Sequence, residues 1–499
     1  MKSRLSIHLS KLLAIGSIVG ASLGIGNQAI AASSVGDVVG KVTVGYQGWF
    51  ACAGDGSPFN GWWHQSPSPN GQGIKCWPDV REYTKTYATQ YANLGNGQPA
   101  RLFSSFDQST VDVQFQWMHE YGIDCAALQR FNPTGGEGPV RDSVTRRVRN
   151  AAEKYSVKFY IMYDVTGWSS AQTQIKTDWT NKMSAYTASP MYAKQNGKFV
   201  VDIWGFGFND ASHPVTSAAA TDIIAWFKGQ GCYVIGGVPR DWRTHTADLP
   251  MYHTLDMISP WMIGSIGNVS SANSTYTNNW VPDQAHCNAN NMDYQPCVIP
   301  GDNSIHQRSH GDLMWCMFYN AVRLGCQGIY ISMYDEYNEG NQIAKTAEDL
   351  TMVPVGSTFV GLNEDGTACS SDYYLRLTGD GGKMLKGQIA LTATRPTPPV
   401  GANGIIGQGS STVGHPAQNK VLELMLGSSH VSLSLAFSAT SVSIYDLCGR
   451  KAANLAVAPG KTVVWNGKDD LGNIVSAGGY LLKATDGKQS VARPFALTF

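Results

Sequence analysis

The 499-residue sequence has little charge and no excess of either sign. Charged residues make up 15% of it, and 37 Lys and Arg balance 37 Asp and Glu. A neutral chain has no overall electrostatic attraction to nucleic acid or to an anionic membrane. The composition therefore argues against nucleic acid as a partner and favours a partner that is uncharged or charged only locally.

The sequence also has few of the usual motifs of cofactor and metal binding. Its ten cysteines include no Cys-x-x-Cys pair. The glycine-rich stretch Thr134–Gly138 lacks the lysine of a phosphate-binding loop. We therefore expect no nucleotide, no redox cofactor and no bound metal, apart from a calcium alternative considered below.

The only long apolar stretch lies at the start of the chain. Lys2 and Arg4 precede the apolar residues 12–26, and Ala29–Ala31 fits a small-residue cleavage site. The stretch is short for a membrane span, and no later stretch is long enough to be one. We expect residues 1–31 to be a signal peptide, with an uncleaved anchor as the alternative. The mature protein is then secreted or held at a bacterial cell surface.

An exported chain can form disulfides. Two pairings would close short loops, although connectivity cannot be deduced from sequence alone: Cys52 with Cys76, and Cys287 with Cys297. Four other cysteines lie in apolar runs and are expected to be buried thiols: Cys125, Cys232, Cys316 and Cys326.

Aromatic residues and glycine are abundant, with 14 Trp, 22 Tyr and 54 Gly. Exposed rings beside glycine-rich loops suit flat, polar, uncharged ligands such as sugars. The alternative is a large core in which aromatic packing accounts for most of the rings.

Eight strand-like runs alternate with helix-like stretches over about three hundred residues. The runs are Lys41–Phe50, Ile123–Phe131, Val157–Val165, Lys198–Phe208, Cys232–Arg240, Leu255–Gly264, Cys297–Gly301 and Cys326–Tyr334. They are continuously apolar, as expected for parallel strands that are buried on both faces. Eight such units predict a (β/α)₈ TIM barrel over residues 32–352. A doubly wound open sheet is the alternative, and the count of strands favours the barrel.

The active site of such a barrel lies at the C-terminal ends of its strands. We expect the following strand-end residues to contact substrate: Tyr46, Trp49, Arg130, Tyr163, Asp164, Trp204, Arg240, Trp242, Trp261 and Tyr334. The aromatic rings would stack on sugar faces. Asp164, Arg130 and Arg240 would bind hydroxyl groups or orient other side chains. For any single residue, capping or packing is an alternative role.

The character of the sequence changes after the barrel. Residues 353–395 read as a short β-rich appendage, and residues 396–419, rich in Pro, Gly and Ser, read as a linker. From residue 420 to 499 apolar and polar residues alternate between turn signals. This pattern predicts a small all-β sandwich.

Glu336 and Glu339 follow directly on the eighth strand-like run. Three residues apart on a helical turn, their Cβ atoms would lie within about 5–6 Å. Glycoside hydrolysis uses two carboxyl groups near one sugar, and a short separation favours retention of configuration. Two like charges at that range also raise one pKa, which suits a proton donor. The alternatives are a solvated pair of charges, or a calcium site that includes Asp335.

The segment Tyr334–Ile343, YDEYNEGNQI, resembles the signature of glycoside hydrolase family 99, and the similarity covers about Lys41 to Leu350. The resemblance implies a (β/α)₈ barrel that cleaves α-mannosidic bonds with retention. It implies that Glu339 is the general acid/base, and that Glu336 is the base that takes the proton of the sugar 2-hydroxyl. His64, in the first long loop, would touch substrate.

Three positions depart from the signature. Asp335 replaces an asparagine, Tyr337 a tryptophan and Asn341 a threonine. The catalytic pair therefore transfers better than the specificity for mannose, and the sugar stays open.

The C-terminal residues resemble an FlgD-type immunoglobulin-like module or a type IX secretion sorting domain, on VWNGKDDLGN and GGYLLKA. That resemblance implies contact with secretion machinery or the cell surface. The ending Arg493–Phe499 departs from the usual basic ending, so a spacer or a carbohydrate-binding module remains the alternative.

The sequence as a whole predicts a secreted, retaining glycoside hydrolase that acts on an α-linked glycan or polysaccharide. Two alternatives remain, a lectin-like barrel without catalysis and a calcium-stabilised structural protein.

Overall fold

The computed structural model describes residues 33–71 and 73–401, and separate segments between residues 422 and 497. The predicted signal peptide and residues 402–419 of the predicted linker lie outside the described residues.

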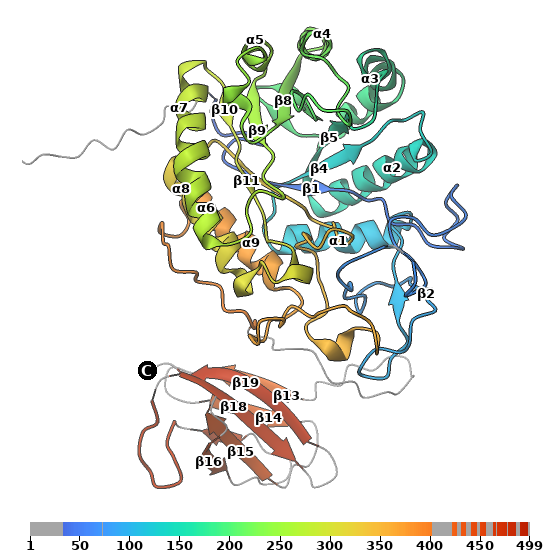
Figure 1. Ribbon diagram of the computed structural model, residues 1–499. Coiled ribbons are helices and arrows are strands. Elements are labelled where there is room, and N and C mark those ends of the chain that lie inside the picture. The colour runs from blue at the N-terminus through green and yellow to red at the C-terminus, as the bar shows by residue number, and fades with distance from the viewer. Residues whose placement is uncertain are drawn as a thin grey trace, which may run out of the picture.

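A ring of parallel strands forms the centre of the first domain (Figure 1). In chain order the strands are β1 (Val42–Tyr46), β4 (Cys125–Arg130), β5 (Lys158–Asp164), β7 (Lys198–Trp204), β8 (Cys232–Val238), β9 (Met257–Pro260), β10 (Asp293–Tyr294), β11 (Cys297–Val298) and β12 (Ile329–Ile331). Neighbours in this order are paired in parallel except β10 and β11, and β12 pairs in parallel with β1. Three further strands lie outside this ring of parallel pairings: β2 (Tyr87–Ala88), β3 (Arg101–Leu102) and β6 (Lys194–Gln195).

β10 and β11 together make one interrupted strand. β10 pairs with β9, and β11 pairs with β12. Between them, Gln295 N donates to Ile258 O at 2.9 Å, and Pro296 O accepts from Tyr330 N at 3.1 Å. The ring of pairings therefore closes, and the domain is an α/β domain of the TIM-barrel type. The open doubly wound sheet is excluded because the first strand pairs with the last.

The helices lie on the outside of this sheet (Figure 1). They are α1 (Gln108–Glu120), α2 (Gly138–Tyr155), α3 (Ala171–Asp178), α4 (Ser217–Gly229), α5 (Leu249–Tyr252), α6 (Val269–Thr275), α7 (Val281–Ala289), α8 (Asp312–Leu324) and α9 (Tyr373–Leu385). In α8 the residues Leu313, Met317 and Ala321 recur at helical spacing and are buried. None of the described helices is long and apolar enough to span a membrane.

Strand side chains alternate between the barrel interior and the helix layer, because successive residues of a strand point to opposite faces. Inside the barrel, Tyr330 of β12 donates from Oη to Met162 Sδ of β5 at 3.3 Å. Outside it, Tyr46 of β1 donates from Oη to Gln114 Oε1 of α1 at 2.5 Å. This alternation decides which strand-end residues reach the mouth of the barrel.

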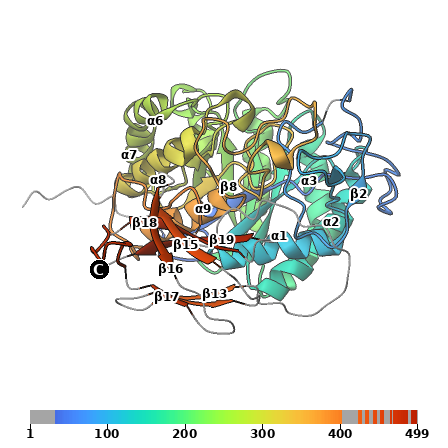
Figure 2. The same cartoon turned by 90° about the horizontal axis from the view of Figure 1, so that it is seen from below.

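The prediction of a β-rich segment at residues 353–395 is wrong, because the segment contains helix α9. Leu377, Gly381 and Met384 lie three or four residues apart and are buried. The aromatic and apolar residues at the start of α9 favour a strand locally, and packing against α8 overrides that preference (Figure 2).

The boundary of the first domain also needs correction. Arg376 of α9 donates to the carbonyl groups of Pro398 and Pro399 at 2.8 and 3.0 Å. Thr397 is buried. Residues 353–401 therefore pack with the barrel, and the domain does not end at residue 352.

Close packing of α9 gives a stability prediction. A Cβ on Gly379 would lie 2.4 Å from the backbone oxygen of Tyr121. Although alanine favours helix, we expect Gly379→Ala to lower the free energy of unfolding by about 1–3 kcal/mol. The matched control is Gly229→Ala at the end of α4, where a Cβ would meet nothing within 4 Å. It should be neutral or stabilising by up to about 1 kcal/mol. Urea unfolding checks both variants, and equal effects would contradict the packing argument.

The C-terminal segments are all β and antiparallel. The strands are β13 (Leu422–Leu426), β14 (Val431–Leu435), β15 (Ser441–Asp446), β16 (Lys451–Leu455), β17 (Val463–Trp465), β18 (Gly478–Thr485) and β19 (Ser490–Leu497). They form the sheets β13-β14-β17 and β16-β15-β18-β19. In β15 the consecutive residues Val442, Ser443 and Ile444 are all buried.

The predicted disulfides are not formed. All nine cysteines in the described part of the chain, which excludes Cys448, are free. Cys52 Sγ donates to Phe103 O at 3.3 Å. Cys297 Sγ contacts Ser332 Oγ, directly after β12, at 3.0 Å, whereas Cys287 lies on α7 in the outer layer. Cys125, Cys232 and Cys326 are buried thiols as predicted, and Cys316 is partly exposed.

Candidate active site

The two glutamates lie on one tight turn after β12. Glu336 O accepts hydrogen bonds from Glu339 N at 3.2 Å and from Gly340 N at 3.1 Å. Gly340 has φ 82°, and a Cβ there would lie 2.2 Å from Asp302 Oδ1. The turn therefore requires glycine at its end, and the helical form of the turn brings the two glutamates to the same side.

Asp335 fixes this turn to the end of β1. Its two carboxylate oxygens accept from the backbone N–H groups of Gln47 and Gly48 at 2.7 and 2.8 Å. Arg141 of α2 donates to the carbonyl groups of the same two residues at 2.5 and 2.6 Å. Asp335 and Arg141 are buried, and burial raises the pKa of Asp335 to about 6. The oxygens of Asp335 are thus already used, which argues against Asp335 as a calcium ligand.

Within residues 33–71, 73–401 and the described C-terminal segments, no group of three or more His, Cys, Asp or Glu is arranged to hold a metal ion.

Glu336 is buried at the mouth of the barrel and is 3% exposed. Gln47 Nε2 donates to its Oε1 at 3.1 Å. Its other oxygen, Oε2, is buried and has no hydrogen-bond partner within standard distance among the described residues, although the Asn341 side chain lies close enough to oppose the rise that burial causes in the pKa of Glu336. Burial raises the pKa of Glu336 well above its usual range, and the charge of Glu339 raises it further.

Glu339 is the exposed member of the pair. Partial burial of its carboxyl group raises its pKa, and Asp302 adds to the rise. Lys75 and His64 oppose the shift, and Lys75 Nζ lies 2.9 Å from Asp302 Oδ2. The two carboxyl groups thus interact electrostatically but differ in access, one buried beside Gln47 and the other open beside a lysine.

A loop that follows β1 holds the turn from its other side. Tyr337 O, between the two glutamates, accepts from Lys75 N and Cys76 N at 2.7 and 3.2 Å. Further along, Asp79 N donates to Lys345 O at 3.0 Å.

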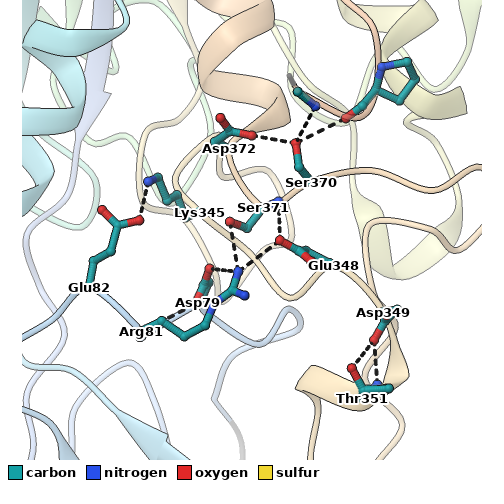
Figure 3. Close-up of polar contacts among 12 residues, drawn as sticks. Asp79, Arg81, Glu82, Lys345, Glu348, Asp349, Thr351, Ser370, Ser371 and Asp372 are labelled. Atoms are coloured by element: carbon teal, nitrogen blue, oxygen red, sulfur yellow. Dashed lines mark hydrogen bonds and ion pairs between the residues drawn. The ribbon is translucent and has the colours of Figure 1, made fainter. Parts of the chain in front are cut away.

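Figure 3 shows further polar contacts between the loop after β1 and the segment after β12. Arg81 lies between Asp79 and Glu348, at 2.7 and 3.0 Å, and Lys345 pairs with Glu82. The segments that follow β1 and β12 are therefore joined both before and after the two glutamates in the sequence, at Asp335 and at residues 345–348.

Five of the residues predicted to bind substrate lie in the packed core instead: Tyr46, Arg130, Tyr163, Trp242 and Tyr334. Tyr46 and Tyr334 point to α1, where Tyr334 Oη donates to Gln114 O at 2.9 Å. Arg130 and Tyr163 both bond to Asp178 of α3. Strand alternation explains the error for Tyr46, Arg130 and Tyr163, which lie at the ends of their strands and point to the outer face. Trp242 and Tyr334 lie beyond the ends of β8 and β12, where packing and not strand alternation buries them.

The other predicted residues lie near the mouth. Trp49 is stacked between His64 and Phe131, with ring centroids 3.8 and 5.5 Å away. Trp204 and Trp261 are in contact, with ring centroids 5.2 Å apart, and both are partly buried.

Two more predicted residues lie at this end of the barrel. Asp164 is 6% exposed, and burial raises its pKa. Arg240 is exposed and lines a polar hollow of about 410 Å³ together with Ser and Asn residues of α6 and its flanks.

Asp164 ends β5 and Glu336 follows β12, so both lie at the C-terminal ends of barrel strands. The pKa of buried Tyr330 is raised by its burial, and the charges of both Glu336 and Asp164 contribute to the rise. Glu137, which ion-pairs with His64 at 3.0 Å, adds to the raised pKa of Asp164. The mouth of the barrel is thus acidic, with His64 and Lys75 as nearby partners.

Sequence reasoning missed five residues of this site: Gln47, Lys75, Glu137, Arg141 and Asp302. Gln47 follows Tyr46 directly, and its inward position could have been found from strand alternation. The others come from loops and a helix far along the chain, and no local pattern marks them.

The sequence matches no known protein-family profile and no curated protein. The structure is similar to that of the GH99 endo-alpha-mannosidase from Bacteroides thetaiotaomicron, with a TM-score of 0.51 and 16% identity over 70% of this chain and 98% of that one. The same enzyme in complex with bis-tris-propane gives a TM-score of 0.53 at the same identity and coverage. The chain has the fold of this enzyme.

Proposed function

We propose that this protein is a glycoside hydrolase that cleaves an α-linked glycan or polysaccharide with retention, and that α-mannan is the first substrate to test. One observation carries the proposal, the placement of Glu336 and Glu339 on a single turn at the end of the last barrel strand. The shared fold with an endo-alpha-mannosidase supports it.

The roles follow the resemblance of the sequence to the family signature. Glu339 donates a proton to the glycosidic oxygen as the bond from C1 to that oxygen breaks. Glu336 takes the proton of the 2-hydroxyl, and O2 forms a bond to C1, which gives a 1,2-anhydro sugar. Glu339 then takes a proton from a water molecule as the water oxygen attacks C1. The C1–O2 bond of the three-membered anhydro ring breaks, and Glu336 returns the proton to O2. Two inversions give net retention.

Three features of the site support this assignment. Glu339 is the exposed carboxyl group, as a donor to an outgoing sugar must be. Glu336 is held by Gln47 through Oε1, and its Oε2 has no hydrogen-bond partner within standard distance in the described part of the chain, so Oε2 can accept from a hydroxyl group. Asp164, at the end of β5, accepts from Thr166 N through Oδ1 at 2.9 Å, and its Oδ2, 3.5 Å from Gln129 Nε2, would accept from a second hydroxyl group.

A pH dependence follows from the raised pKa values of both glutamates. The reaction needs one proton on the pair, on Glu339, and burial in the free protein favours that proton on Glu336. When substrate binds, the proton must therefore move from Glu336 to Glu339, and the total charge of the two carboxyl groups stays the same. Since both pKa values are raised, the singly protonated pair persists above the usual glutamate pKa of about 4.3.

We expect kcat/KM to follow a bell-shaped pH profile whose alkaline limb lies well above pH 4.3. Initial rates from pH 3 to 9 at constant ionic strength measure it. An alkaline limb between about pH 4 and 5 would contradict the raised pKa values.

The proposal is tested with purified protein incubated with plant, yeast and bacterial glycans, α-mannan among them, with products read by mass spectrometry. Products from the wild type that vanish in Glu336→Gln and Glu339→Gln establish the hydrolase and identify its substrate. Binding without products, unchanged in both variants, would instead indicate a lectin-like barrel.

We also propose that the protein is exported and that its C-terminal segment is an immunoglobulin-like module of the FlgD or sorting type. The seven antiparallel strands in two sheets support the second part. Cell fractionation of the native host with and without residues 420–499 tests whether this module retains the protein at the surface.

A further inference from the structure

The loop after β1 is built to bring Trp63 back beside the end of that strand. Ala51 and Trp63 exchange two backbone hydrogen bonds, each 3.2 Å long, which close the loop between them. Inside the loop, Asp55 accepts from the backbone N–H groups of Cys52 and Ser57 at 3.0 and 2.7 Å. The base of the loop is therefore fixed, and Trp63 has a defined position.

Trp63 is exposed and yet oriented. Its side chain is 41% exposed, whereas most tryptophans of the barrel domain are buried. Its ring stacks on Phe59 with centroids 4.9 Å apart and an interplanar angle of 19°, and its Nε1 donates to Glu137 Oε1 at 3.1 Å. An aromatic ring that is already held loses little conformational freedom when a ligand binds to it.

Glu137 connects this ring to the catalytic turn. Its Oε1 also pairs with His64 Nε2 at 3.0 Å, and its Oε2 lies 3.6 Å from Arg141 Nε. Although burial raises its pKa, the hydrogen bond from His64 and the charge of Arg141 hold the pKa of Glu137 below its usual value. His64 in turn lies close enough to lower the pKa of Glu339.

We propose that Trp63 is a stacking platform for a sugar ring of the substrate beside Glu339, and that Glu137 is the positioning residue that orients it. The inference rests on the proposed function. The C–H face of a pyranose suits an exposed indole. A nucleotide is disfavoured, because Glu137, Glu339 and Asp302 give this side of the mouth a negative field that repels phosphate.

Kinetics on the glycan that the wild type cleaves, with α-mannan tried first, test the proposal. We expect Trp63→Ala to raise KM about 3- to 10-fold with kcat within about two-fold, and Trp63→Phe to recover part of the loss. Glu137→Ala should raise KM similarly. The double variant should be no worse than the worse single variant, because both act through one ring. Trp226→Ala, on the far helix α4, is the control and should leave KM unchanged.

Each outcome separates this inference from the proposed function. An unchanged KM in Trp63→Ala, with an unchanged Tm and normal turnover, overturns the platform and leaves the hydrolase intact. Additive effects of the two substitutions overturn the positioning role of Glu137. Absence of turnover and of binding in the wild type, on every glycan tested, overturns the proposed function itself. Binding is also measured in the Glu336→Gln background, where the loss of affinity from Trp63→Ala should persist without turnover.

Discussion

Glu336→Gln should reduce kcat/KM on the cleaved glycan by a factor of about 10² to 10⁴, the range that proton transfer by a positioned group supplies. The amide has nearly the shape of the carboxyl group but cannot take the proton of a hydroxyl. Because the pKa of Glu336 is raised by burial, the neutral amide should not destabilise the fold, and Tm should stay equal or rise. Initial rates and thermal unfolding on the same samples measure both quantities.

Glu339→Gln is the matched variant, and the two losses should differ in their response to the leaving group. A substrate with a good leaving group, such as a nitrophenyl glycoside, needs no proton donor, so it should restore glycosidic cleavage in Glu339→Gln. It should restore nothing in Glu336→Gln, since the 2-hydroxyl still keeps its proton. Rescue of Glu336→Gln and not of Glu339→Gln would reverse the assigned roles.

Arg130→Met should destabilise the protein by about 3–5 kcal/mol, the usual loss when one partner of a buried ion pair is removed. Arg130 and Asp178 are 1% and 2% exposed in their side chains and are joined by hydrogen bonds of 2.6 and 2.5 Å. The variant leaves Asp178 charged in the core, where Tyr163 Oη, at 2.9 Å, is its one remaining side-chain donor among the residues that the structure describes. Urea unfolding should give a lower midpoint with an unchanged slope.

The exposed Arg240 provides the control for this prediction. Arg240→Met should change the free energy of unfolding by less than about 0.5 kcal/mol. Replacing both members of the buried pair, with Arg130→Met and Asp178→Leu, should recover part of the stability. Full stability of Arg130→Met with a raised KM would instead return Arg130 to the substrate site.

The fold was largely predictable from the sequence because parallel strands that are buried on both faces appear as continuously apolar runs. Runs such as Val157–Val165 are apolar throughout, and their count and spacing predict a barrel. The predicted seventh run, Cys297–Gly301, covers only β11, the second half of the interrupted strand. The first half, Asp293 and Tyr294 of β10, was missed because it is short and is separated from the apolar run by Gln295 and Pro296.

The site was predictable only in part. Position at a strand end does not determine which way a side chain points. Adjacent residues at one strand end point in opposite directions, one to the helix layer and one to the barrel interior. Tyr163 bonds to Asp178 in the outer layer, whereas Asp164, the next residue, lies at the mouth. Applying the two-residue alternation would have separated the outward Tyr46, Arg130 and Tyr163 from the inward Asp164 and Trp204, because all five lie within strands.

Long-range packing accounts for the remaining differences. The strand preference of the residues that open α9 is a local signal, and burial of Leu377 and Met384 outweighs it. The expected pairing of Cys287 with Cys297 rested on their closeness in sequence. In the structure Cys287 lies on the outer helix α7, whereas Cys297 lies on the barrel strand β11 beside Ser332.

The clamp between Asp335 and the end of β1 has a consequence for how the protein becomes active during synthesis. Its two hydrogen bonds join residues 288 and 287 positions apart, and Gln47 and Glu336 are 289 apart. A chain released from the ribosome progressively can form its early helices and strands long before Asp335 exists, since domains fold from the N-terminus onward. No such intermediate can hold Glu336 in place, because Gln47 and Glu336 come together only when the last strand, β12, pairs with β1. Glycan turnover therefore reports the final closure of the barrel, and a folding assay based on activity should lag behind one based on circular dichroism.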